Sequence, residues 1–225
     1  MSVSARIKEL NKRLAQKLTA KGVEASETET MTSLINKIDN LPTGQSDIDF
    51  SSLTEWQYFS YYNNRNTLVA KLKYSDTSNG TNFSGMFYSC SGLTTIPQLD
   101  TSKGTGFGSM FNGCSKLTTI PQLDTSNGTN FSNMFYSCSA LTNLTIAGSI
   151  NTSGMNLKSA TKLSKSSITS VVNALSASAS GKSITFSKTA VNNAFETSSG
   201  VADGSTSEEW TTLIATKANW TIALS

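Results

Sequence analysis

The 225-residue chain has no histidine, only three cysteines and three prolines, and few carboxylates. Without histidine, the chain can assemble neither a Ser-His-Asp or Cys-His nucleophile nor an ordinary zinc site. A glycosidase pair of carboxylates would need distant residues such as Glu55, Asp76 and Asp100 to converge. No glycine-rich loop joins a strand to a helix in the manner of a phosphate site. We therefore expect a protein that is not an enzyme and that holds no cofactor or catalytic metal.

The chain also lacks clustered charge and long apolar segments. Its formal net charge is +3, with no basic or acidic run, so we expect no nucleic-acid partner. The N-terminal sequence MSVSARIKELNKRL carries charges where a signal peptide needs an apolar core. No run approaches the roughly 18–20 apolar residues of a membrane span, so we expect no membrane insertion. These features predict synthesis and folding in a reducing cytoplasm.

What the chain does contain is a three-fold repeat with a period of 24 residues and no insertion or deletion. The units are DTSNGTNFSGMFYSCSGLTTIPQL (76–99), DTSKGTGFGSMFNGCSKLTTIPQL (100–123) and DTSNGTNFSNMFYSCSALTNLTIA (124–147). A repeat of this length is typical of a solenoid, because one coil cannot bury its apolar face without stacking on its neighbours. The apolar positions recur in register, so we expect each of them to form a ladder along the stack.

Each unit divides into two halves with different patterns. The spacing F-x-x-M-F-x-x-C, which begins at Phe83 in the first unit, is i, i+3, i+4, i+7 and predicts a short helical turn. The second half, residues 93–96 in the first unit, is short and β-branched and predicts a strand. Pro97 and Pro121 are expected to end their strands, since proline lacks the donor that a central ladder needs.

The cysteines Cys90, Cys114 and Cys138 occur once per unit at the same place. Stacking would bring neighbouring sulfur atoms close enough for a disulfide bond. Their odd number and identical placement favour the alternative, a ladder of small buried thiols.

The aspartates Asp76, Asp100 and Asp124 also recur once per unit. Aligned carboxylates would make a calcium-binding edge, but we favour the interpretation that each caps its own Asp-Thr-Ser turn. The Asn-Gly pairs at Gly80 and Gly128 are expected to supply a positive φ in a tight turn.

The unit F-x-x-M-F-x-x-C-x-x-L-x-x-I-P-x-L-D-T-S resembles the BspA-like class of leucine-rich repeats. It is similar to the Asp-Thr-Ser variant found in bacterial surface proteins and in many bacteriophage structural proteins. The resemblance covers residues 76–147 strongly and extends more weakly into both flanks. It implies an α/β fold: a right-handed, leucine-rich-repeat-like solenoid with a parallel sheet on one side, preceded by a short helical module. It implies no enzymatic activity.

Residues 1–42 predict an N-terminal helical module. Residues 3–21 form an amphipathic pattern, and Gly22 is the expected end of that helix. A second helix is expected to begin with a capping box formed by Ser26 and Glu29. Two short helices are marginal alone, so we expect their apolar stripes to serve oligomerisation or docking; the alternative is a cap folded back on the solenoid. The residues predicted for docking are Ile7, Leu10, Leu14, Leu18, Met31, Leu34, Ile35 and Ile38.

Residues 43–75 combine a linker with an aromatic segment. A solenoid needs an atypical terminal unit over its first coil, and we expect Trp56 and Phe59 to form this N-terminal cap. Surplus tyrosines here and in the repeats favour an exposed platform that stacks on sugar rings or on a protein receptor. The candidate receptor-contact residues are Tyr61, Tyr62, Tyr88 and Tyr136.

Residues 148–225 lose the period but keep an alternation of helical and strand patterns. Ser164 and Ser207 precede two expected helices, and a third helical stretch is expected near residues 190–195. Residues 183–186 and 220–224 predict strands. We expect these elements to form irregular coils that cap the C-terminal end of the solenoid.

The resemblance and the composition together predict a non-enzymatic bacteriophage virion appendage of the fibre type. Its N-terminal helices would dock on other virion proteins, and its solenoid would bind a host-surface glycan or protein. A homotrimer is expected from the general symmetry of fibres. The expected location is the virion surface, as a tail or head fibre, after synthesis in the host cytoplasm. The first alternative, from a different class, is a purely structural head-fibre or baseplate decoration protein; a bacterial surface adhesin comes third, because no export or anchoring signal is visible.

Overall fold

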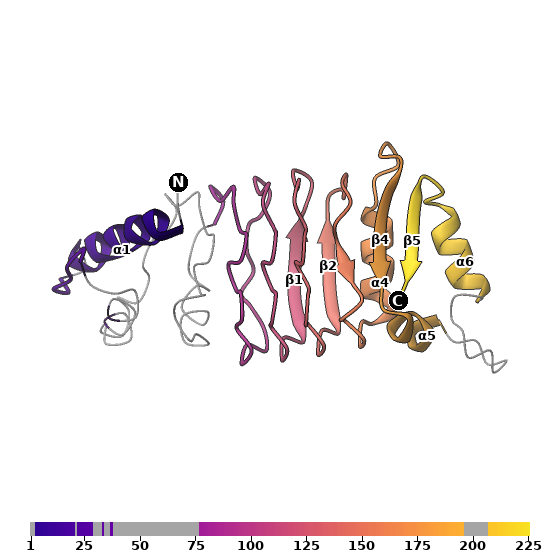
Figure 1. The fold of residues 1–225 in the computed structure, drawn as a ribbon, viewed down its shortest axis with the longest axis horizontal. Coiled ribbons are helices and arrows are strands. Elements are labelled where there is room, and N and C mark those ends of the chain that lie inside the picture. The colour runs from indigo at the N-terminus through magenta and orange to yellow at the C-terminus, as the bar shows by residue number, and fades with distance from the viewer. Residues whose placement is uncertain (1–2, 21, 29–32, 34–36, 38–76, 196–206) are drawn as a thin grey trace.

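The computed structural model of the protein describes residues 3–20, 22–28, 33, 37, 77–195 and 207–225. These residues form an elongated row of stacked coils, with helix α1 at one end and β5 and α6 at the other (Figure 1). The elements are α1 (Val3–Ala20), β1 (Thr119–Asp124), β2 (Asn143–Ala147), β3 (Asn156–Leu157), α4 (Lys165–Ala174), β4 (Lys182–Phe186), α5 (Lys188–Phe195), α6 (Glu208–Ala215) and β5 (Trp220–Leu224).

Helix α1 coincides with the amphipathic pattern at the N-terminus. Leu14, Ala15 and Leu18 are at most 2% exposed, so this stripe is buried within the chain. The helix ends before Gly22, which has a positive φ of 77° as expected of a C-terminal stop. Of the predicted second helix, the structure describes residues 26–28, Ser33 and Lys37. The N–H of Thr28 donates to the hydroxyl of Ser26 (3.3 Å), while Glu29, the other half of the predicted capping box, and the aromatic segment lie outside the described residues.

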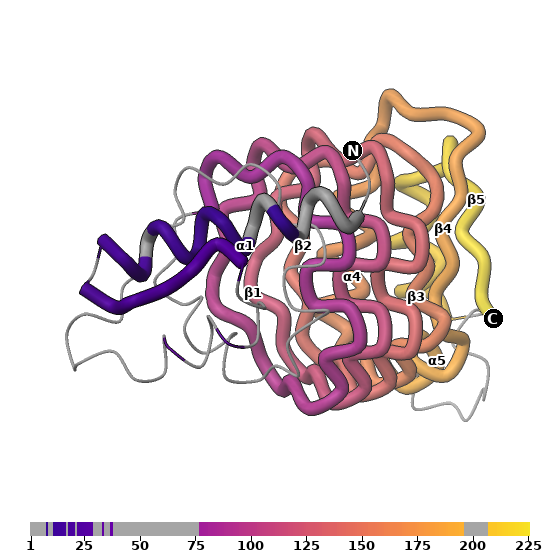
Figure 2. Tube along the Cα trace, turned by 60° about the vertical axis from the view of Figure 1, so that its left-hand side comes forward, coloured from indigo at the N-terminus to yellow at the C-terminus, as the bar shows by residue number. Residues whose placement is uncertain are grey.

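The three repeats stack so that equivalent residues lie side by side, one coil apart (Figure 2). Each coil has two limbs. The strand limbs, residues 95–100, 119–124 and 143–147, are joined by parallel pairing of β1 with β2 and by a bridge between Thr95 and Thr119. The turn limbs, residues 82–90, 106–114 and 130–138, are joined by parallel bridges at residues 82, 106 and 130.

Backbone hydrogen bonds tie neighbouring coils together on both limbs. On the turn limb, the N–H of Phe83 donates to the carbonyl of Gly106 (2.8 Å), one coil further along the chain. On the strand side, the N–H of Thr118 donates back to the carbonyl of Thr94 (2.9 Å), one coil earlier. Both limbs therefore satisfy backbone groups that a lone coil would leave open.

The predicted apolar ladders are confirmed. The rings of Phe83, Phe107 and Phe131 stack with centroids 5.8 and 5.5 Å apart. A second row joins Phe87, Phe111 and Phe135 with centroids 5.4 and 5.9 Å apart. All six rings are fully buried. The remaining buried ladder positions are Met86, Met110, Met134, Cys90, Cys114, Cys138, Leu93, Leu117, Leu141, Ile96, Ile120 and Leu144.

Threonines form a polar ladder inside the stack. Thr77, Thr101 and Thr125 are at most 2% exposed. The hydroxyl of Thr77 donates to the carbonyl of Asp100 (2.9 Å) and accepts from the N–H of Asp100 (2.8 Å), so it bridges two coils. Thr101 does the same with Asp124. Burial of these hydroxyls is tolerated because each is hydrogen-bonded.

The turn limb buries Phe83, Met86, Phe87 and Cys90 together, as their spacing predicts, but it consists of hydrogen-bonded turns rather than the predicted short helical turn. Its i+3 hydrogen bonds are interrupted by left-handed residues, at φ 62° for Gly85 and 59° for Ser89 in the first coil. The equivalent residues Ser109, Gly113, Asn133 and Ser137 also have positive φ. Because serine, asparagine and glycine all adopt this conformation at the same places, it belongs to the geometry of the coil.

Two further local predictions are wrong. Pro121 does not end its strand but lies inside β1, at the irregularity where the register with β2 shifts between Ile120 and Leu123. The glycine of the Asn-Gly pairs does not supply a positive φ. A Cβ atom at Gly80 would lie 2.4 Å from the Phe83 ring, so this position requires glycine because of close approach.

Helix α4 covers the outer edge of β2. Its N-cap is Ser164, as the sequence predicts. The hydroxyl of Ser167 accepts from the N–H of Leu144 (2.9 Å) and donates to the carbonyl of Thr142 (3.0 Å). Ser170 accepts from the N–H of Ile146 (3.0 Å). The serine hydroxyls thus make the hydrogen bonds that the backbone of a further strand would make, and they close this edge of the sheet.

The turn-limb side continues into a parallel sheet of order β3-β4-β5. The strands at residues 182–186 and 220–224 and the helices after Ser187 and Ser207 confirm the patterns seen in the sequence. The Trp210 ring joins α6 to this end of the core. Its centroid lies 6.0 Å from that of the Phe186 ring and 5.3 Å from that of the Phe195 ring.

Candidate ligand-binding surface

A row of three side chains lies along the turn limbs: Tyr88, Asn112 and Tyr136, at the same position of successive coils. Tyr136 is 52% exposed, and no other large apolar side chain is exposed among the residues that the structure describes. Tyr88 and Asn112 are half-buried. We refer to these three residues as the tyrosine row.

The backbone holds the tyrosine row firmly. The N–H of Tyr88 donates to the carbonyl of Gly85 (3.0 Å), and the N–H of Tyr136 donates to that of Asn133 (3.1 Å). Between the coils, the carbonyl of Asn112 accepts from Ser89 (2.7 Å) and that of Tyr136 accepts from Gly113 (2.9 Å). The backbone from which each side chain of the row extends is therefore held in place by hydrogen bonds.

The spacing of the row follows from the core beneath it. Phe87, Phe111 and Phe135 directly precede the three residues, and their rings step by 5.4 and 5.9 Å from coil to coil. Tyr88 and Tyr136 therefore stand two such steps apart, with the shorter Asn112 between them. This arrangement places two aromatic surfaces on either side of an amide, which donates and accepts hydrogen bonds.

A second polar surface lies where the strand limbs lead into the Asp-Thr-Ser turns. It is a groove of about 300 Å³, lined by Gln98, Leu99, Asp100, Thr101, Ser102, Gln122 and Asp124.

The carboxylates of this groove are engaged in their own turns. Asp100 accepts from the Ser102 hydroxyl (2.6 Å) and from the Ser102 N–H (3.0 Å), and both bonds, with nearby Lys103, lower the pKa of Asp100. Asp124 accepts from the N–H of Ser126 (2.9 Å). This confirms the predicted capping role of these two residues; Asp76 lies outside the described residues.

The amide of Gln98 crosses the groove. It donates to the carbonyls of Leu99 (3.0 Å) and Gln122 (2.8 Å). Among the residues that the structure describes, no three His, Cys, Asp or Glu side chains come together as a metal site would require.

The cysteines are buried free thiols, as the ladder interpretation predicts. The thiols of Cys114 and Cys138 donate to the carbonyls of Phe87 and Phe111, each at 3.1 Å. Burial raises the pKa of Cys138 to about 12 and raises that of Cys114 further. A thiol that stays protonated is a poor nucleophile and a poor metal ligand, so these residues are structural.

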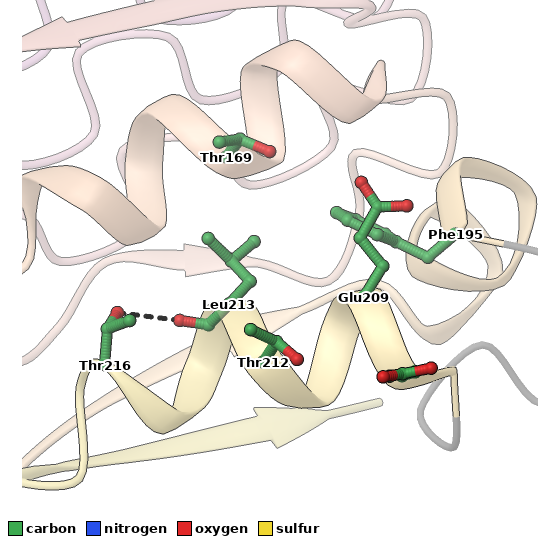
Figure 3. Close-up of a pocket in the computed structure, with 7 residues that line it drawn as sticks. Thr169, Phe195, Glu209, Thr212, Leu213 and Thr216 are labelled. Carbon is green, nitrogen blue, oxygen red and sulfur yellow. Dashed lines mark hydrogen bonds between the residues drawn. The ribbon is translucent and has the colours of Figure 1, made fainter.

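A third depression, of about 650 Å³, lies between α4, α5 and α6 (Figure 3). Leu213 points towards α4 and Glu209 towards Phe195. Glu209 forms an ion pair with Lys165 (2.5 Å), whose ammonium also lies 5.4 Å from the Phe195 ring centre. Phe195 is 2% exposed, so its ring is already covered and offers little surface to a ligand.

The structure places only some of the predicted site residues. Tyr61 and Tyr62 lie outside the described residues, as do Met31, Leu34, Ile35 and Ile38. Ile7 and Leu10 belong to α1, but their side chains are not among those that the structure describes. Leu14 and Leu18 are buried within the chain, and their docking role stays a prediction.

Asn112 is the member of the tyrosine row that sequence reasoning missed. The signal was present, because the period places Asn112 at the position of Tyr88 and Tyr136. The left-handed residues on either side of the row were also signalled by the exchange of glycine with serine or asparagine at 85, 109 and 133.

A family model described as "Mycoplasma protein of unknown function, DUF285" matches residues 56–171, just over half of the chain. No curated protein and no solved structure matches. None of the helices that the structure describes has the length and apolar character needed to cross a membrane.

Proposed function

Since the chain belongs to the DUF285 family, whose function is unknown, we propose its function from its own surface. The protein is a non-enzymatic binding protein. Its right-handed, leucine-rich-repeat-like solenoid holds the tyrosine row against a repeating polysaccharide of a cell surface. The observation that carries this proposal is the pair Tyr88 and Tyr136, held two coil steps apart with Asn112 between them.

The chemistry of the row suits a sugar polymer. A tyrosine ring stacks on the apolar face of a sugar, and its hydroxyl and the Asn112 amide can hydrogen-bond to sugar hydroxyls. The row carries no charge, so neutral hydroxyls match it better than a phosphate or a carboxylate. Two rings at a fixed separation favour alternate units of one extended polymer over a single sugar, because the second contact is intramolecular.

The setting that we infer is a fibre-like appendage of a virion. We assign the N-terminal module an attachment or oligomerisation role from the resemblance alone, with a trimer as the expected assembly, because the described part of the α1 stripe is buried within the chain. The alternative is a structural decoration protein whose stack acts as a spacer. The two differ in whether the purified protein binds a surface polysaccharide.

The test is binding of the full chain to immobilised bacterial cell-wall polysaccharides and to intact bacteria. We expect Tyr88→Ala and Tyr136→Ala each to weaken binding about threefold to tenfold, because a stacking contact is worth about 0.5–1.5 kcal/mol. Tyr136→Phe keeps the ring and serves as the matched control, with a smaller loss. Lys116→Ala, in an exposed turn of the middle coil, should bind as the native chain does.

Unfolding curves show whether each variant keeps its fold. If the native chain binds polysaccharide but the folded double variant of Tyr88 and Tyr136 binds equally well, the tyrosine row is not the site. If the native chain binds no polysaccharide or cell, the spacer alternative is favoured.

A further inference from the structure

At the end of the described stack away from α1 lie strand β5 and helix α6 (Figure 1). Along one edge β5 pairs in parallel with β4, from Lys182 opposite Trp220 to Phe186 opposite Leu224. The sheet order β3-β4-β5 makes the other edge of β5 the outer edge of the sheet.

The hydrogen bonds of Ser225 show which groups face outward. Its N–H donates to the carbonyl of Phe186 (3.1 Å), and its carbonyl accepts from the N–H of Lys188 (3.0 Å), so residue 225 is directed towards β4. Because the direction alternates along a strand, Ile222 and Leu224 direct their N–H and C=O groups outward. Within residues 77–195 and 207–225, no hydrogen bond satisfies these outward groups.

This open edge contrasts with the treatment of β2. There Ser167 and Ser170 of α4 occupy the backbone groups of the last strand. Strand β5 has no such cover in the described residues, and its sequence, WTIAL, contains none of the charges or prolines that usually protect an edge. Ile222 and Leu224 are also half-exposed, so the edge offers apolar surface together with open backbone groups.

We propose that β5 pairs with β5 of a second copy of this chain, in an antiparallel arrangement about a two-fold axis at Ala223, as a contact separate from the trimer expected of the N-terminal module. Two identical strands that meet at a closed two-fold axis must run antiparallel. Ile222 of each copy then lies opposite Leu224 of the other. The N–H and C=O groups of these two residues in one copy pair with the same four groups of the other copy, which gives four hydrogen bonds in total.

The residue at the axis fits this register. Ala223 faces its own copy as a non-hydrogen-bonded pair, in which the Cα atoms approach to about 4.5 Å and large side chains would crowd. Its side chain is small and exposed. The strand is uncharged, so self-pairing brings no like charges together. A second copy is therefore the occupant whose chemistry the edge matches along its whole length.

The test is sedimentation velocity of the full chain over a concentration series. The native chain should associate reversibly, and Ala223→Lys and Ala223→Glu should each weaken association about tenfold or more by placing like charges at the axis. Mixing these two variants should restore association, because unlike charges then meet. Thr221→Lys, exposed on the same strand but away from the axis, is the matched control.

Circular dichroism of each variant verifies the fold. Association that is unchanged in folded Ala223→Lys would overturn the proposal, since the contact must then lie elsewhere, for example in the N-terminal module. A native chain that stays monomeric at every concentration would also overturn it and would leave the edge to a strand of another protein.

Discussion

The glycine at the fifth position of each coil lies against a phenylalanine ring. At Gly104, a Cβ atom would lie 2.6 Å from Cζ of Phe107, 2.9 Å from the carbonyl oxygen of Thr101 and 3.1 Å from Cδ2 of Phe83. Two of these neighbours are ladder rings and the third is backbone, so none can move without disturbing the stack. The position is fixed by packing rather than by backbone conformation.

We expect Gly104→Ala to lower the free energy of unfolding by about 1–3 kcal/mol, the usual cost of overpacking. Chemical denaturation measures this. Gly92→Ala is the control, because Gly92 is exposed and the third coil carries Ala140 at that position. Equal stability of the two variants would show that the ring does not limit this site.

The thiol ladder predicts a dependence of stability on pH. Burial raises the pKa of Cys138 from its ordinary value of 9.0 to about 12. The unfolded thiol releases its proton above pH 9 while the folded thiol keeps it. The contribution of the buried, protonated thiol to the free energy of unfolding is therefore complete below pH 9. As the pH rises towards 12, the free energy of unfolding falls by about 1.4 kcal/mol per pH unit for each such thiol.

Urea unfolding of the native chain and of Cys138→Ala between pH 8 and pH 11 tests this, with the pH values set by the two pKa values above. The variant should be less stable at pH 8, because it lacks a buried sulfur, but its stability should fall less steeply with pH. Parallel curves for the two proteins would contradict the assignment.

At the scale of elements, the edge of β2 depends on two serines of α4. Ser167 is 3% exposed, and its replacement by alanine leaves the N–H of Leu144 without a partner. We expect Ser167→Ala to cost about 1–3 kcal/mol, the usual penalty for an unsatisfied buried donor. Amide hydrogen exchange at Leu144 should accelerate in this variant.

Ser166→Ala is the matched control for that measurement. Ser166 is the preceding residue of the same helix, but it is exposed and contacts the hydroxyl of Ser164. Its replacement should change stability by a few tenths of a kcal/mol at most and should leave exchange at Leu144 unaltered. Similar effects of the two variants would mean that helix propensity, rather than edge capping, controls α4.

The elements differ in how far the sequence predicts them. Helices α4 and α6 have serine N-caps and regular apolar spacing, and both signals are local, so their positions follow from the sequence. The turn limb shows the same spacing from Phe83 onward but is not helical. In the turn limb, residues with positive φ direct these side chains into one core without a helix. The spacing of buried side chains does not by itself distinguish this backbone conformation from a helix.

For the candidate site, the period predicts that Tyr88 and Tyr136 lie on one surface, because identical positions stack. The exposed fraction of each ring depends on neighbouring turns and could not be predicted. The open edge of β5 was also hidden in the sequence, since an edge is defined by the partner that a strand lacks. Such features require the arrangement of the whole chain.

In the whole molecule, the 24-residue coil is the structural unit that repeats. Deletion of residues 100–123 removes one complete coil and joins Leu99 to Asp124, which recreates the Leu-Asp junction of the native repeats. Phe83 can then stack on Phe131, and Thr77 can bridge to Asp124 as it bridges to Asp100 in the native chain. Deletion of residues 100–111 removes half a coil and breaks every ladder.

The most direct measurement is the thermal unfolding of these two deletion variants, followed by circular dichroism. We expect a cooperative transition for the variant that lacks 100–123, at a temperature below that of the native chain because one set of coil contacts is lost. We expect no cooperative transition for the stack in the variant that lacks 100–111. Failure of the full-coil deletion to fold, or equal behaviour of the two variants, would contradict the claim that the chain is built from interchangeable stacked coils.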